Sequence, residues 1–204
     1  MISYLQVDNL SKRFGEQILF EGISFGIGKG QKVALIAKNG MGKSTLLRII
    51  AGKDSPESGS VIFRNDITVG YLDQDPQLEP ENTVFEEVFN SDSPVLSLIK
   101  AYEEAVASDD SAALEKLIPE IDIHSAWDYE NTIKQILSEL KIATYNKKIS
   151  TLSGGQKKRV GLAKVLISNP DFLILDEPTN HLDIEMTEWL EEYLEKSNAT
   201  LLMV

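Results

Sequence analysis

One segment of the sequence combines residue types that could do chemistry on phosphate groups, and it reads Ala37-Lys38-Asn39-Gly40-Met41-Gly42-Lys43-Ser44-Thr45. The backbone N–H groups of such a loop, placed before a helix, can surround phosphate oxygens. Lys43 would supply a cation to the same oxygens, and Ser44 a hydroxyl to Mg²⁺. The segment predicts a phosphate-binding loop. The alternative is an ordinary glycine turn before a core helix.

Ala37 departs from the usual pattern of this loop, GxxxxGK[ST], because it stands where the pattern has its first glycine. Glycine tolerates a positive φ, whereas alanine costs about 1 kcal/mol there and little at a negative φ. We expect the loop to close with alanine in this place.

A second segment, Phe172-Leu-Ile-Leu-Asp176-Glu177-Pro178, has four apolar residues followed by two carboxylates. The apolar run predicts a buried parallel strand, and ligands bind at the carboxyl ends of such strands. Asp176 is predicted to hold Mg²⁺, and Glu177 to orient or deprotonate the attacking water. The alternative is a strand that ends in a solvated acidic turn.

A third segment, Leu152-Ser153-Gly154-Gly155-Gln156, precedes a predicted helix. A serine hydroxyl and free N–H groups at a helix N-terminus can bind an anion. One domain cannot easily aim two such sites at the same γ-phosphate from opposite sides, whereas a second, facing domain can. The alternative is a capped helix start with a flexible loop.

The elements that position these segments predict an α/β fold. Short strands are expected at residues 4–7, 18–27, 32–36, 60–63, 68–71, 172–175 and 200–204, and helices at 43–51, 154–168 and 184–196. Glycines 22, 26, 28 and 30 are taken as signs of tight hairpins.

Between about residues 84 and 145 the strand signals stop, which predicts a helical insert of two or three helices. The first is expected to start at Ser93-Pro94, and residues 108–111 to form a polar turn. The second is expected from residue 112, weakened at Pro119, and the third at 128–142. This insert has ten acidic residues and four lysines between Lys100 and Lys141, which predicts a solvated lobe rather than an RNA-binding face.

Composition restricts the possible classes of protein. The chain has 204 residues, no cysteine and a net charge of −12, so a disulfide framework is excluded and DNA or RNA binding is not favoured. No apolar run approaches the roughly 20 residues of a membrane helix, and the N-terminus lacks a signal-peptide core. We expect a cytoplasmic chain without membrane insertion.

The three segments, in this order, resemble the ATP-binding-cassette (ABC) superfamily, and the resemblance covers nearly the whole chain. It implies a P-loop NTPase core of ABC type with an antiparallel β subdomain and an α-helical subdomain, and it implies ATP and Mg²⁺ as cofactors. Phe14 resembles the aromatic residue that stacks on adenine, the alternative being a core phenylalanine. Gln74 resembles the Q-loop glutamine, which contacts Mg²⁺ and water, and Leu182-Asp183 resembles the D-loop. The expected catalytic residues are Lys43, Gln74 and Glu177, and the expected metal ligands are Ser44, Gln74 and Asp176.

Two features resemble the ABC-F branch more than transporter ATPases. They are the stretch Thr179-Asn180-His181-Leu182-Asp183 and the long insert between Gln74 and Leu152, within which residues 127–137 resemble the Uup-like bacterial proteins. The resemblance implies a first cassette of a longer two-cassette ATPase that acts on translation, with a second cassette and possible ribosome contact. The alternatives are the ATP-hydrolysing subunit of a membrane transporter and a non-catalytic interaction module.

The C-terminal residues form an apolar run, so we expect a single domain, 1–204, truncated from a longer chain. The family's switch histidine is expected beyond Val204, since His124 and His181 do not sit in that context. Such a fragment is expected to bind ATP better than it hydrolyses it.

Overall fold

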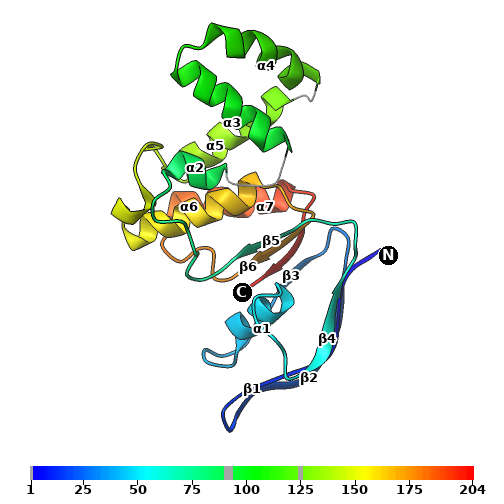
Figure 1. Cartoon of the computed structure of the whole chain (residues 1–204). Coiled ribbons are helices and arrows are strands. Elements are labelled where there is room, and N and C mark those ends of the chain that lie inside the picture. The colour runs from blue at the N-terminus through cyan, green and yellow to red at the C-terminus, as the bar shows by residue number, and fades with distance from the viewer. Residues whose placement is uncertain (1, 90–93, 124–125) are drawn as a thin grey trace. The chain divides into compact units, whose positions relative to one another are not determined.

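The computed structural model describes residues 2–89, 94–123 and 126–204, and these fall into two compact units. The first unit comprises the residues up to Pro76 together with Asn169–Val204, and the second comprises Gln77–Ser168. Figure 1 labels the elements of both.

A parallel sheet forms the centre of the first unit. Its strands, in the order β3-β7-β6-β5, are β3 (Lys32–Ala34), β7 (Thr200–Met203), β6 (Phe172–Leu175) and β5 (Val69–Leu72). Every neighbouring pair is parallel, and β6 is buried along its whole length, as its apolar run predicted. The carboxyl ends of all four strands therefore lie at one edge of the sheet.

An antiparallel sheet is the second layer of this unit, with the order β2-β1-β4. Its strands are β1 (Ser3–Phe14), β2 (Gln17–Gly28) and β4 (Ser58–Phe63). The β1–β2 hairpin turns at Gly15, which has a φ of 60°.

The prediction that glycines 22, 26 and 28 mark hairpins is wrong, because all three lie within β2. Gly26 pairs with Gln6 on the neighbouring strand, so this glycine lies in the β1–β2 ladder rather than in a turn. Gly30 lies in a turn, but that turn joins β2 to β3, which belong to different sheets.

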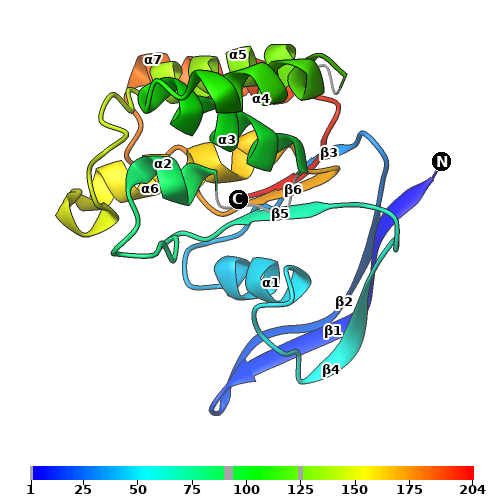
Figure 2. The same ribbon diagram turned by 45° about the horizontal axis from the view of Figure 1, so that its top comes forward.

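Helix α1 (Lys43–Ile50) lies between the two sheets (Figures 1 and 2). The hydrophobic core of the unit combines residues of both sheets and of α1. They are Tyr4, Leu5, Val7, Leu10, Ile27, Leu46, Leu47, Ile49, Ile50, Phe172, Ile174 and Leu202. The ring of Phe63 on β4 meets that of Phe172 on β6 edge to face, with centroids 5.2 Å apart. Helix α7 (Ile184–Lys196) lies on the side of the parallel sheet away from α1. This packing holds the start of α1 near the carboxyl edge of the sheet.

The second unit is helical, and it contains both the helices of the predicted insert and α6, which the sequence analysis placed after that insert. Its elements are α2 (Val84–Val88), α3 (Pro94–Ala107), α4 (Ser111–Ile123), α5 (Ala126–Glu139), a short 3₁₀ helix η1 (Ile149–Thr151) and α6 (Gly154–Ile167). Helix α3 begins at Pro94, while Ser93 and His124 lie outside the described residues. Pro119 lies inside α4, which continues through it. Rings of Tyr102 and Trp127 meet with centroids 5.1 Å apart and join α3 to α5.

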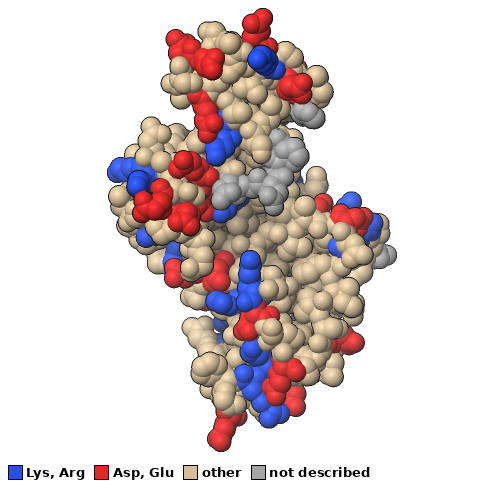
Figure 3. Space-filling model, viewed as in Figure 1, with Lys and Arg blue, Asp and Glu red and all other residues tan. Residues whose placement is uncertain are grey.

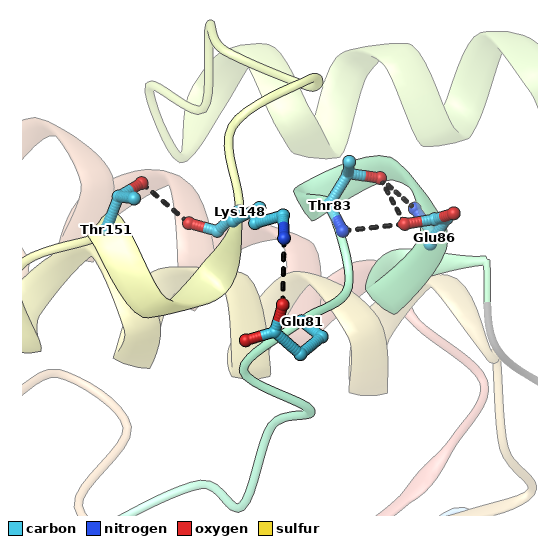
Figure 4. A network of polar contacts seen from close by, with 5 residues as sticks. All are labelled: Glu81, Thr83, Glu86, Lys148 and Thr151. Atoms are coloured by element: carbon cyan, nitrogen blue, oxygen red, sulfur yellow. Dashed lines mark hydrogen bonds and ion pairs between the residues drawn. The ribbon is translucent and has the colours of Figure 1, made fainter.

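Polar contacts fix the start of α2 against the chain before η1 (Figure 4). Thr83 and Glu86 form a capping box, in which each side chain accepts from the other's backbone N–H. Lys148 donates to Oε2 of Glu81 over 2.8 Å, and Thr83 and Lys148 form an isolated antiparallel bridge. Two segments distant in sequence are thereby joined.

Acidic side chains gather over α3 and α4 on the face shown in Figure 3, with few basic ones among them. This agrees with the ten acidic residues and four lysines counted between Lys100 and Lys141. Among the helices described, none has the length and apolar character needed to cross a membrane.

Candidate functional site

The predicted phosphate loop joins the end of β3 to the start of α1. Gly40 and Gly42 have φ values of 81° and 79°, in the left-handed region that favours glycine. Gly42 is the N-cap of α1, and no side chain of the described residues caps this helix. The N–H groups of its first turn are therefore left for an outside acceptor.

Ala37 does not strain the loop. The non-glycine residues with positive φ in the described chain are Asn9, Asp109, Lys141, Asn169, Glu177 and His181, and Ala37 is not among them. The usual glycine at this position is therefore not needed for the backbone conformation seen here.

Lys43 folds back over the loop from the first position of α1. Its Nζ donates to the carbonyl oxygen of Ala37 over 3.0 Å and to Oδ1 of Asn39 over 3.2 Å. The ammonium is therefore held above the loop backbone, where a phosphate oxygen could exchange for these acceptors. The other residues predicted to contact the nucleotide in this loop differ in burial. Lys38, Asn39, Gly40 and Met41 are exposed, whereas Gly42, Ser44 and Thr45 are partly buried.

Asp176 follows β6 and is a buried carboxylate without a satisfactory partner. It is 1% exposed, and neither carboxylate oxygen has a well-oriented hydrogen-bond partner in the described part of the chain. Burial raises the pKa of Asp176, with Glu177 and Asp73 adding to the rise, while the nearby Ser44 hydroxyl and Lys43 oppose it. A buried carboxylate of this kind needs a compensating charge.

The residues around Asp176 fit Mg²⁺. A carboxylate and the Ser44 hydroxyl are the oxygen ligands this ion prefers, and Mg²⁺ usually binds proteins through one or two carboxylates together with substrate phosphates and water. The described residues contain no group of three or more His, Cys, Asp or Glu side chains suited to a metal. An ion here would therefore depend on phosphate oxygens, which is the arrangement expected beside a phosphate loop.

Glu177 has a strained backbone and a well-fixed side chain. Its φ is 48°, which is unusual for a residue other than glycine and is often found at functional sites. Its backbone N–H donates to the carbonyl oxygen of Val204 over 3.1 Å. Its Oε2 accepts from Nε2 of Gln74 over 3.0 Å and from Nδ2 of Asn180 over 2.6 Å. The structure thus brings Gln74, which follows β5, together with Glu177, which follows the neighbouring β6.

Phe14 ends β1 and is 79% exposed, so the alternative of a core phenylalanine is excluded. An exposed aromatic face is available to stack on a base. Its role in nucleotide binding stays a prediction.

The segment Ser153–Gln156 lies in the second unit, where it starts α6. Ser153 and Gln156 form a capping box: Oγ of Ser153 accepts from the Gln156 N–H over 3.3 Å, and Oε1 of Gln156 accepts from the Ser153 N–H over 2.9 Å. A Cβ built on Gly154 would meet open space. The interpretation as a capped helix start is confirmed, and the predicted anion contact through Gly154 and Gly155 stays a prediction.

Sequence reasoning did not assign a role to Asn180, which the structure places against Glu177. An asparagine three residues after a carboxylate can close a turn onto it, but the sequence does not show that this turn forms. His181, with a φ of 79°, follows in the same turn, and Asp183 caps α7 by accepting from the Met186 N–H over 3.0 Å.

The fold described above is that of an ABC ATPase cassette, and comparison with known proteins agrees. The family model described as ABC transporter matches residues 20–180. The chain therefore belongs to the ABC transporter family, and it is an ABC ATPase domain with the α/β fold that the sequence predicted.

Two curated relatives are similar to the chain over nearly its whole length. The chain is 40% identical over 211 residues to YfmR of Bacillus subtilis (strain 168), an uncharacterized ABC transporter ATP-binding protein, covering 100% of this chain and 34% of YfmR. It is 37% identical over 195 residues to the energy-dependent translational throttle protein EttA of Escherichia coli (strain K12), covering 91% of this chain and 35% of EttA. The chain thus spans about a third of the length of these relatives. These relatives are consistent with the predicted resemblance to a first ABC-F cassette.

A solved structure of an ATP binding subunit of an ABC transporter superposes with a TM-score of 0.70 at 25% identity, covering 98% of this chain and 78% of that one.

Proposed function

We propose that this chain binds ATP with Mg²⁺ through residues 37–45 and hydrolyses it with Glu177 as the base that activates water. The observation that carries the proposal is the buried, unsatisfied carboxylate of Asp176 beside Ser44 and Lys43, with the fixed side chain of Glu177 next to it. The Mg²⁺ of a bound nucleotide would supply the positive charge that compensates the Asp176 carboxylate.

The residues divide the reaction between them. Lys43 and the first N–H groups of α1 would bind and stabilise the phosphate oxygens. Glu177 would accept a proton from a water molecule as the water oxygen bonds to the γ-phosphorus. The bond from that phosphorus to the bridging oxygen breaks, and its electron pair leaves with ADP. Bound Mg²⁺ would offset the negative charge on the phosphates.

A second cassette is part of the proposal, because the capped segment Ser153–Gln156 would offer its Gly154 and Gly155 N–H groups to the nucleotide of a facing domain. The chain spans about a third of the length of relatives such as EttA, so those proteins contain further residues that could form a second cassette.

Turnover in the complete protein that carries this chain tests the chemistry. Glu177→Gln is expected to lower kcat by about 10²-fold or more, since it removes the base, while ATP affinity stays close to that of the wild type. The exposed Glu188→Gln is the matched control and should keep full activity. Full turnover in the Glu177 variant, or no turnover in the wild type, would refute the catalytic proposal and favour a non-catalytic module.

We further propose that the complete protein is an ABC-F ATPase that acts on the ribosome. The similarity to a translational throttle protein and the stretch Thr179–Asp183 support this. The acidic surface of α3 and α4 favours contact with basic ribosomal protein over contact with RNA phosphates. Co-sedimentation with ribosomes in the presence of ATP, and not ADP, is expected for the Glu177→Gln protein. Absence of ATP-dependent binding would contradict this assignment.

The second candidate is the ATP-hydrolysing subunit of a membrane transporter, supported by the likeness to a transporter's ATP binding subunit. Purification of the native protein from cells separates the two candidates. A stoichiometric integral membrane partner would favour the transporter, and ribosomal proteins would favour the ABC-F assignment.

A further inference from the structure

Two side-chain amides converge on the same oxygen of Glu177. Nε2 of Gln74 lies 3.0 Å from Oε2, and Nδ2 of Asn180 lies 2.6 Å from the same atom. Among the described residues, no side chain is bonded to Oε1. The two oxygens of this carboxylate are therefore not equivalent, because Oε2 accepts two side-chain hydrogen bonds and Oε1 accepts none from the described side chains.

Asn180 also holds the backbone of Glu177. Its N–H donates to the carbonyl oxygen of Glu177 over 3.2 Å, so the same residue closes the turn and bonds the side chain. Glu177 has a φ of 48°, and such a conformation persists only where the surroundings enforce it. Asn180 is exposed and does not pack in the core. Its structural role therefore lies in its contacts with Glu177.

We propose that Asn180 is a positioning residue for hydrolysis, which holds Oε2 of Glu177 and so presents Oε1 to the attacking water. This rests on the proposed function of Glu177 as the base. In the step, Oε1 takes the proton from water as the water oxygen bonds to the γ-phosphorus, and ADP leaves with the electron pair of the broken bond. Asn180 touches neither water nor nucleotide in this scheme and acts only through Glu177.

Asn180→Ala in the complete protein tests the proposal, with the exposed Asn198→Ala as the matched control. The expected result is a fall in kcat of about ten- to hundredfold, the range that misplacing a catalytic group produces. KM and ATP affinity should change by less than about twofold, since binding does not use this contact. Asn180→Asp, which keeps the shape but replaces the donor by a like charge, should lose at least as much. It also provides the test if the alanine variant fails to fold.

A double-mutant cycle separates positioning from general damage to the turn. In the E177Q background, where the base is absent, Asn180→Ala should change the single-turnover rate by less than about twofold. An equal loss in both backgrounds, or wild-type kcat for both Asn180 variants, would overturn the role of Asn180 alone. Full activity of the E177Q protein would instead overturn the proposed function, so the two failures are distinguishable.

Discussion

Nε2 of Gln74 donates to Oε2 of Glu177 over 3.0 Å, although the two residues lie 103 positions apart in the sequence. The contact exists because β5 and β6 are parallel neighbours whose carboxyl ends meet at one edge of the sheet. Leu72 pairs with Leu175 at the end of these strands, which places the residues after them side by side. The parallel sheet thus converts two distant loops into one site.

Gln74→Ala should lower turnover more than ATP binding. The variant loses one of two donors to Glu177, so we expect kcat to fall by about tenfold while ATP affinity changes little. Steady-state kinetics and calorimetry on the same preparations measure the two effects. The exposed Gln17→Ala is the control. A large loss of affinity with unchanged kcat would place Gln74 in nucleotide binding instead.

Asp176→Asn should abolish the stabilisation that Mg²⁺ adds to the ATP-bound protein. For a ligand at a hundred times its Kd this stabilisation is about 2.7 kcal/mol, and thermal melts with and without Mg²⁺ detect it. The nucleotide-free variant should melt no lower than the wild type, because the lost carboxylate is buried without a well-oriented partner. The exposed Asp8→Asn should keep the Mg²⁺ effect. An unchanged increment in the Asp176 variant would disprove its role as ligand.

Ala37→Gly should not increase the stability of the protein. Ala37 has no positive φ, so Ala37→Gly is expected to cost about 0.4–1 kcal/mol of stability through the freer unfolded chain. Gly40→Ala is the matched opposite, since Gly40 has a φ of 81° and alanine there should cost about 1 kcal/mol or more. Denaturant unfolding of both variants measures this. Stabilisation by Ala37→Gly would show that the loop is strained after all.

The buried ion pair between Lys164 and Glu87 in the second unit should contribute more to stability than an ion pair on the surface. Glu87 is 1% exposed, and its carboxylate accepts from Lys164 over 2.6 Å and from Nδ2 of Asn82 over 2.9 Å. Lys164→Met leaves this charge without its cation and should cost about 2 kcal/mol or more, reduced from the full buried-pair range because Lys164 is partly exposed.

Lys196→Ala is the control for that pair, because Lys196 and Glu192 form an exposed pair expected to contribute less than about 0.5 kcal/mol. Urea denaturation compares the two variants. Equal losses would mean that the contact between α2 and α6 does not depend on the Glu87 charge.

The sequence predicted most of the fold because local signals were strong. The apolar run predicted a strand at 172–175, and β6 has these bounds. The helix predicted at 184–196 likewise has the same bounds as α7. The glycines of β2 were misleading, because glycine can lie inside a strand as well as in a turn, and only the strand pairing decides which.

The candidate site was predictable in its residue types but not in its connections. The phosphate loop and the Asp176-Glu177 pair each follow a strand, so their common edge could be inferred. The contact of Asn180 with Glu177 could not, since it depends on a left-handed turn at a glutamate, which sequence propensity disfavours. The Ser153–Gln156 capping box was recognisable only as a helix start.

Calorimetric titration of ATP with Mg²⁺ into the wild type and Lys43→Ala tests the central claim that the loop at residues 37–45 holds the triphosphate. Loss of the Lys43 ammonium should weaken binding by about ten- to hundredfold, since hydrogen bonds to charged groups contribute about 1.5–3 kcal/mol each. Lys53→Ala, an exposed lysine just beyond α1, should bind as the wild type does. Equal affinity of all three proteins for ATP would contradict the assignment of this site.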